Sequence, residues 1–256
     1  MKAFCFTVDD NIIFLKDLTE RNYNSIFEHP YLAMYKRLRK SFNLKIQLNL
    51  FYKTEGFDLS VMSDRYLAEW KANSDWLRLS FHSDLNNVKP YEFSGYDEVF
   101  SDCEKVNREI LRFASPDSLA KTTTVHYCLT TKEGRRAVAD NGVLGLLGLY
   151  GTAEKPETSY SVDAESADKI RRGNIVKVDG ISHAAIDVVL NCFSKEENLR
   201  KLSALTDRES IRVMIHEQYF YPDYKAYQPD FEAKLFAAFS FLTSNGYESR
   251  FFEELI

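Results

Sequence analysis

Hydrophobic positions follow two different periods along this chain, and windows of the two kinds succeed one another from end to end. Residues 44–50 read Leu-Lys-Ile-Gln-Leu-Asn-Leu, a strict alternation that predicts a strand with one polar face. Residues 99–113 carry apolar side chains three or four positions apart, which predicts an amphipathic helix. The same criteria predict further strands over residues 3–10, 77–82, 122–128, 143–149, 174–178, 186–190 and 212–216, and further helices over residues 32–42, 64–72, 132–140 and 230–244.

A strand-like window followed by a helix-like window recurs about seven times with short links, which predicts parallel strands. Asn-Gly pairs at 141–142 and 245–246 end two of the helices, and Ser-Lys-Glu-Glu at 194–197 is a capping box that opens another. Residues 151–185 are less regular, so we interpret them as an insertion. The expected fold class is α/β, with residues 1–256 in a single domain that is either a doubly wound sheet or a (β/α) barrel.

The composition is that of a soluble globular protein, with 45% hydrophobic and 28% charged residues. A formal net charge of −5 provides no basic surface, which argues against a nucleic-acid partner. No apolar run approaches the ~20 residues of a membrane span, and the first residues lack the pattern of a signal peptide. The four cysteines are widely scattered, as expected of free thiols in a reducing compartment. We therefore expect a cytoplasmic protein with no membrane partner.

Two adjacent carboxylates, Asp9 and Asp10, end the first predicted strand. Like charges side by side repel each other, and a divalent cation is the simplest compensation. The alternative is that one of the two acids caps a helix that begins near Asn11. Neighbouring strand residues point to opposite faces, so both acids reach one site only if the backbone turns there, which Asn11 would permit.

Three of the five histidines, His82, His126 and His216, lie on or at the ends of predicted parallel strands. Asp9 and Asp10 occupy the same place on the first strand, so in a barrel all of these side chains would face one mouth. A carboxylate together with imidazoles suits Zn²⁺ or another first-row divalent ion. His126 lies inside its predicted strand, where a hydrogen-bonded core histidine is as good an interpretation as a metal ligand.

The segment after the last predicted strand, residues 218–227, contains four tyrosines and one phenylalanine. These rings, Tyr219 and Tyr221 among them, would form a wall against which a sugar ring stacks, if they line the mouth. The alternative is an aromatic loop that packs on the rim of the fold. Both interpretations are open at this point.

The arrangement resembles the polysaccharide deacetylase superfamily (NodB homology, carbohydrate esterase family 4-like), a distorted (β/α) barrel, over about residues 3–250. Residues 7–11, Thr-Val-Asp-Asp-Asn, are similar to its first motif, T-F-D-D-G. That resemblance implies that Asp9 is the general base and Asp10 a metal ligand. Residues 81–86 are similar to the second motif, H-[S/T]-x-x-H, and imply His82 as a ligand, with Asn86 in place of the second histidine as a weaker ligand or none. Residues 213–217 are similar to the last motif and imply His216 as the general acid.

The chain is a divergent member by this resemblance, because the third motif, R-x-P-Y/F-G, is missing. Residues 124–131 read Thr-Val-His-Tyr-Cys-Leu-Thr-Thr in its place, so His126 is a candidate replacement ligand by position, and no base-tuning arginine can be placed. At the same mouth we expect four residues to contact the substrate: Tyr127, Glu217, Tyr219 and Tyr221.

The expected function is a metal-dependent hydrolase that acts on an acetylated carbohydrate, with a divalent ion, zinc first, that activates water. One alternative is a carbohydrate-binding barrel of the same fold with impaired catalysis, which Asn86 and the missing third motif favour. Another is an amide or phosphoester hydrolase that uses His126 as a ligand. The sequence predicts no oligomeric state.

Overall fold

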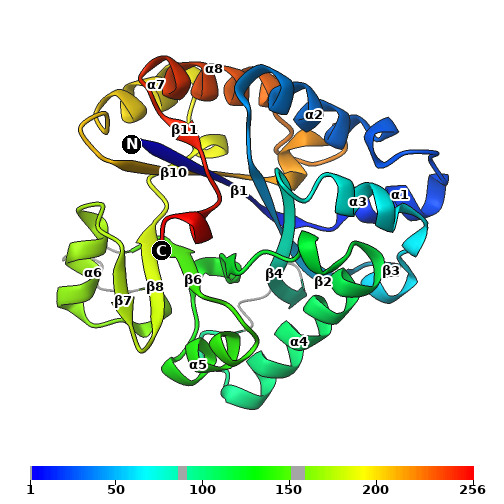
Figure 1. Cartoon of the computed structure of the whole chain (residues 1–256), viewed down its shortest axis with the longest axis horizontal. Coiled ribbons are helices and arrows are strands. Elements are labelled where there is room, and N and C mark those ends of the chain that lie inside the picture. Colours follow the sequence, from blue (N-terminus) through cyan, green and yellow to red (C-terminus); the bar gives the residue numbers. More distant parts are fainter. Residues whose placement is uncertain (1, 86–90, 151–158) are drawn as a thin grey trace.

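The computed structural model describes residues 2–85, 91–150 and 159–256, so Asn86 lies outside the described residues. Parallel strands form the centre of the molecule and helices surround them (Figure 1). This confirms the α/β class and the parallel strands. Among the described helices, none is long and apolar enough to cross a membrane.

The larger sheet is built from parallel strands in the order β4–β2–β1–β10–β9. Its central strand β1 is buried along nearly its whole length, because Phe4, Phe6 and Val8 on one side and polar side chains on the other all face the interior. Two short strands extend this sheet, β3 antiparallel to β2 and β11 parallel to β1. The bounds are β1 Ala3–Asn11, β2 Ile46–Thr54, β3 Phe57–Asp58, β4 Leu77–Leu85, β9 Val188–Val189, β10 Ser210–His216 and β11 Glu248–Ser249.

The smaller sheet has the order β5–β6–β8–β7, in which β5, β6 and β8 are parallel and β7–β8 is an antiparallel hairpin. Among the described residues, an isolated bridge between Leu79 and Leu119 links β4 toward this sheet. The ladders of these residues form two sheets that this bridge connects. The bounds are β5 Thr122–Thr123, β6 Gly145–Gly148, β7 Val176–Val178 and β8 Ile181–Ala185.

Helices cover the outside of the strands, and the periodicity located them well. The helix predicted over 132–140 has those bounds, and Ser194 and Glu197 form the predicted capping box. The described helices are α1 Ile13–Arg21, α2 Pro30–Phe42, α3 Leu67–Ala72, α4 Tyr96–Phe113, α5 Lys132–Asp140, α6 Ala164–Arg171, α7 Lys195–Ser203 and α8 Phe231–Ser244.

One strand prediction was wrong in a way that matters for the site. The strand predicted over 122–128 ends at Thr123, and His126–Cys128 form a 3₁₀ turn in which Tyr127 and Cys128 have positive φ. The strand predicted over residues 44–50 is present as β2, and its polar side chains Gln47 and Asn49 are buried in the interior. Of the proposed insertion, residues 151–158 lie outside the described residues, and the rest contains α6 and the hairpin β7–β8.

His183, on β8, gives the fold a specific sensitivity to acid. Burial, with the charge of Arg135, lowers the pKa of His183 from 6.5 to about 4. Between these values the unfolded chain binds more protons, so stability falls as the pH falls from about 6.5 to about 4, by about 1.4 kcal/mol per pH unit. The difference in unfolding free energy between the wild type and His183→Gln should therefore be about 2 kcal/mol smaller at pH 5 than at pH 7 in urea titrations. A difference that is the same at both pH values would contradict this assignment.

Candidate metal centre

The backbone turns at the end of β1, at Asp10 itself, which has a φ of 63°. The register between β1 and β2 shifts between Val8 and Asn11 at this turn. Asn11 braces it: Nδ2 donates to the carbonyls of Val8 (2.6 Å) and Asn49 (3.1 Å), and Oδ1 accepts from the Tyr31 hydroxyl (2.8 Å). The turn that the two acids require is present, and Asn11 holds it in place from the following position.

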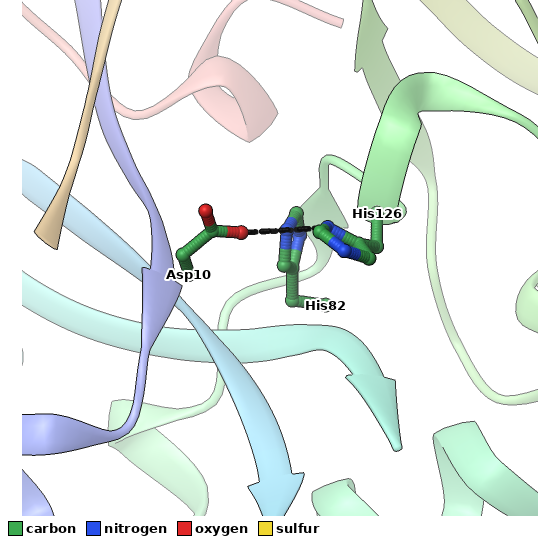
Figure 2. Close-up of side chains that lie close together, drawn as sticks. All are labelled: Asp10, His82 and His126. Atoms are coloured by element: carbon green, nitrogen blue, oxygen red, sulfur yellow. Dashed lines mark hydrogen bonds and ion pairs between the residues drawn. The ribbon is translucent and has the colours of Figure 1, made fainter. Parts of the chain in front are cut away.

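Three side chains from separate elements meet at this turn (Figure 2). Asp10 Oδ1 lies 3.1 Å from His82 Nε2 and 3.4 Å from His126 Nδ1, and the two imidazole nitrogens are 3.1 Å apart. One ligand atom from each residue falls within 4.8 Å of the others. A carboxylate and two imidazoles in this arrangement can hold a divalent ion and leave coordination positions open for water or substrate.

Neighbouring groups orient the ligand atoms of this triad, Asp10, His82 and His126. The ring nitrogen Nδ1 of His82 donates to the carbonyl of Thr124, which fixes the ring so that Nε2 is directed at Asp10. Gln218 Nε2 donates to Asp10 Oδ2 at 2.8 Å, so that Oδ1 faces the imidazoles. Metal-bound histidines and carboxylates are typically held by such outer hydrogen bonds.

The electrostatics of the triad suit a cation. Burial opposes ionisation of Asp10, but hydrogen bonds from His126 and His82 together hold its pKa well below the ordinary value. Burial lowers the pKa of His126, so its imidazole is neutral at pH 7. Burial also works against a proton on His82, but the charges of Asp9 and Asp10 outweigh it and raise the pKa of His82. A bound cation would take the place of that proton between the same negative charges.

Asp9 lies beside the triad and is held by a buried network of amides and hydroxyls. Asn49 Nδ2 donates to Asp9 Oδ1 at 2.6 Å, and Asn49 Oδ1 accepts from Gln47 Nε2 at 2.8 Å and from the Ser80 hydroxyl. Gln47 is fixed in turn by the carbonyl (2.9 Å) and the hydroxyl (2.8 Å) of Thr122. Burial raises the pKa of Asp9, and the nearby His82 and His216 only partly oppose this.

His216 ends β10, directly opposite Asp9 in the ladder of β1 and β10. It is not one of the three ligand residues that converge. Asn191 Oδ1 accepts hydrogen bonds from its backbone N–H (3.2 Å) and its ring nitrogen Nδ1 (2.9 Å), which leaves Nε2 as the nitrogen that can exchange a proton with a substrate.

A cavity of about 210 Å³ opens onto the triad. The sequence did not predict most of the residues that line it. Gln218 and Tyr224 lie in the aromatic segment 218–227, but no sequence feature distinguishes them from their neighbours as lining residues. The cavity is lined by Asp10, Ile12, Ile13, Phe51, His126, Gln218 and Tyr224.

Glu217 is not placed to contact a substrate. Its carboxylate is fully buried and accepts the backbone N–H groups of Ile12 (2.6 Å), Ile13 (2.9 Å) and Phe14 (2.7 Å), together with the Tyr221 hydroxyl (2.8 Å). Glu217 therefore caps α1 from a distant part of the chain. This also shows that the capping alternative for Asp9 and Asp10 was wrong.

The three tyrosines expected at the mouth lie in different surroundings. The ring of Tyr127 packs on His126 with centroids 4.2 Å apart, and its side chain is 48% exposed. Tyr219 packs near His216 at 6.1 Å. Tyr221 binds Glu217 through its hydroxyl and packs near Tyr31 at 6.2 Å, so this part of the aromatic segment packs on the rim of the fold.

Gln218 should influence metal affinity although it contributes no ligand atom. Gln218→Met removes the hydrogen bond to Asp10 Oδ2 and keeps the size of the side chain. We expect the affinity for Zn²⁺ to fall by about 10- to 100-fold, as for other residues that orient metal ligands. Competition with a chromophoric chelator measures this, and an unchanged dissociation constant would show that Asp10 needs no such support.

Several solved structures are similar to this chain in fold, and three of them are described here, whereas the sequence itself matches no protein-family model and no curated protein. A family 4 acetyl xylan esterase from Clostridium thermocellum, in complex with a cobalt ion, has a TM-score of 0.54 at 14% identity, over 99% of this chain and 90% of that one. A peptidoglycan N-acetylglucosamine deacetylase has a TM-score of 0.56 at 10% identity, over 99% and 87%. A 4-alpha-glucanotransferase from Thermococcus litoralis has a TM-score of 0.60 at 11% identity, over 99% and 40%. At these identities the likeness shows the fold alone.

Proposed function

We propose that this chain is a metal-dependent hydrolase that removes an acetyl group from an N- or O-acetylated carbohydrate. The observation that carries the proposal is the convergence of Asp10, His82 and His126. The fold supports it, because two of the similar structures are named as an acetyl xylan esterase and a deacetylase. We propose zinc as the ion, since one carboxylate and two imidazoles with open positions suit it.

The proposed ligand set differs from the one that the sequence motif implies. In place of the second histidine of that motif the chain has Asn86, which lies outside the described residues. His126 lies in the 3₁₀ turn after β5, and its Nδ1 faces Asp10 and His82. We propose His126 as the third protein ligand.

In the proposed reaction, Asp10, His82 and His126 would hold a divalent ion, which would supply acidified water and a Lewis acid for the acyl carbonyl. Asp9 takes the proton of the attacking water, and its raised pKa makes it a stronger base than an ordinary aspartate. Asn49 fixes Asp9 Oδ1 and so orients the carboxylate. His216, held through Nδ1 by Asn191, delivers a proton from Nε2 to the leaving amine or alcohol.

Metal content and hydrolysis together test the proposal. Purified protein should hold one equivalent of zinc and release acetate from N- or O-acetylated saccharides, and Asp10→Ala and His82→Ala should each abolish both. Asp75→Ala, which removes an exposed surface carboxylate, is the control for loss of a charge. Retention of the metal in both triad variants would refute the proposed centre.

The same experiment separates the alternatives. Saccharide binding without acetate release would favour the carbohydrate-binding barrel with impaired catalysis. Turnover of small amides or phosphoesters in the absence of activity on acetylated sugars would favour the other hydrolase. In both cases the metal content still tests the triad as a metal centre, because that measurement does not depend on the substrate.

A further inference from the structure

A second pocket, of about 450 Å³, lies between α5 and the hairpin β7–β8, the two elements that Figure 1 shows at the lower left. None of the residues of the triad lines it. Its size falls in the range of small-ligand sites. The residues that line it are Lys132, Glu133, Arg135, Arg136, Asp179 and Ile181.

Arg135 is the unusual member of this pocket, because its side chain is only 4% exposed. Its Nη2 donates to Asp179 Oδ2 at 2.8 Å. The Asp179 side chain, at the turn of the hairpin, is itself 51% exposed. Nε and Nη1 are buried and have no hydrogen-bond partner among the residues that the structure describes. A buried charge normally has several partners, so one half-exposed carboxylate leaves this guanidinium incompletely compensated.

The position of Arg135 is fixed by close packing of the helix around it. The neighbouring Gly134 meets the preceding loop so closely that a Cβ there would lie 1.9 Å from the Thr130 hydroxyl oxygen. The Thr131 hydroxyl caps α5 by accepting the N–H of Gly134 at 3.0 Å. These contacts hold the start of α5, and with it the backbone of Arg135, close against the preceding loop.

The rim of the pocket adds two more cations on the same helix. Lys132 and Arg136 are exposed and lie one turn apart, and Lys132 forms no ion pair within residues 2–85, 91–150 and 159–256. Arg136 is 3.6 Å from Asp140 at the end of the helix. Glu133 and Asp179 are the acidic residues of the lining, so three cations face two carboxylates.

We propose that this pocket binds the oxyanion, a carboxylate or a phosphate, of a small ligand. Such a group would pair with Lys132 and Arg136 at the rim and would add the negative charge that Asp179 alone supplies to Arg135. The site is independent of the proposed hydrolase activity, because it shares no residue with the triad and its ligand need not be the substrate.

Binding of two simple probes to the whole chain tests the proposal. Inorganic phosphate and D-glucuronate are titrated by calorimetry at constant ionic strength, with glucose as the uncharged comparison. We expect saturable binding of at least one anion and none of glucose, and the probe that binds identifies phosphate or carboxylate as the recognised group. Lys132→Ala/Arg136→Ala should weaken it by about tenfold or more, and Arg135→Met likewise.

The matched control is Lys169→Ala/Arg172→Ala, which removes the same charge from exposed positions on and just after α6. This control should bind the anion as the wild type does. Because the rim variant alters only exposed residues, it remains informative if Arg135→Met fails to fold. Three results would overturn the proposal: no binding of either anion, equal binding in the rim variant and the wild type, or equal weakening in the rim and control variants.

Discussion

Replacement of His126 by alanine should abolish zinc binding at the proposed metal centre. Without the imidazole, the ion would keep only Asp10 and His82 of the three converging side chains, and a four-coordinate zinc site needs at least three protein ligands. We expect the affinity for Zn²⁺ to fall by more than about 100-fold, beyond the effect of losing an outer hydrogen bond, and hydrolysis to be lost with it. Elemental analysis after gel filtration and a chelator competition measure the two quantities.

Tyr127→Asn is the matched control for this variant. Tyr127 follows His126 and packs on its ring, but it is not one of the three converging ligand residues. Its φ of 59° lies in the left-handed region, where asparagine is better tolerated than alanine. The control should keep the ion, and a His126→Ala protein that binds zinc as tightly as the wild type would show that this histidine is not a ligand.

The first strand and its two acids could be predicted from the sequence because each depends on local chemistry. An apolar strand that ends in Asp9-Asp10 needs compensation for its two negative charges wherever it lies. His82 could be predicted at the same mouth because it lies at the end of another predicted parallel strand. The resemblance in residues 7–11 and 81–86 added the roles. The structure brings Asp10 and His82 together as these patterns indicated.

His126 could be predicted as a candidate ligand by position alone, because its place beside Asp10 depends on a turn that the sequence pattern does not predict. The run Thr-Thr-Thr-Val before it is rich in β-branched residues and reads as a strand. The chain instead leaves the sheet after Thr123, and two residues with positive φ follow at 127 and 128. Tertiary contacts decide this, among them the Tyr160 hydroxyl at the N–H of Val125.

The polar face of β2 shows a different limit of prediction from hydrophobic alternation. Alternation shows which residues share a face but not whether that face meets solvent or the interior. Gln47 and Asn49 share the polar face and are buried, because Thr122, Ser80 and Asp9 satisfy their amides from three other strands. These hydrogen bonds between strands exist only in the folded sheet, so no local sequence pattern predicts them.

Replacement of Glu217 by leucine will destabilise the fold by about 4 kcal/mol. The change removes the acceptor of the N–H groups of Ile12, Ile13 and Phe14 and leaves all three buried without partners, each at a cost of about 1–3 kcal/mol. Glu217→Gln keeps one acceptor oxygen and should cost about half as much. Urea unfolding followed by tryptophan fluorescence at pH 8 measures both, above the pKa of about 7 to which burial raises this carboxyl.

Glu197→Gln provides the comparison, because Glu197 also caps a helix but does so at the surface, in the capping box of α7. That change should cost about 1 kcal/mol or less. If Glu217→Leu were equally mild, the buried cap would not anchor α1. The effect should also reach the metal centre, because Ile12 and Ile13 lie two and three residues after Asp10 and line its cavity. Zinc affinity should therefore weaken in folded Glu217→Gln and stay unchanged in Glu197→Gln, which makes the cap of α1 part of what holds Asp10 in place.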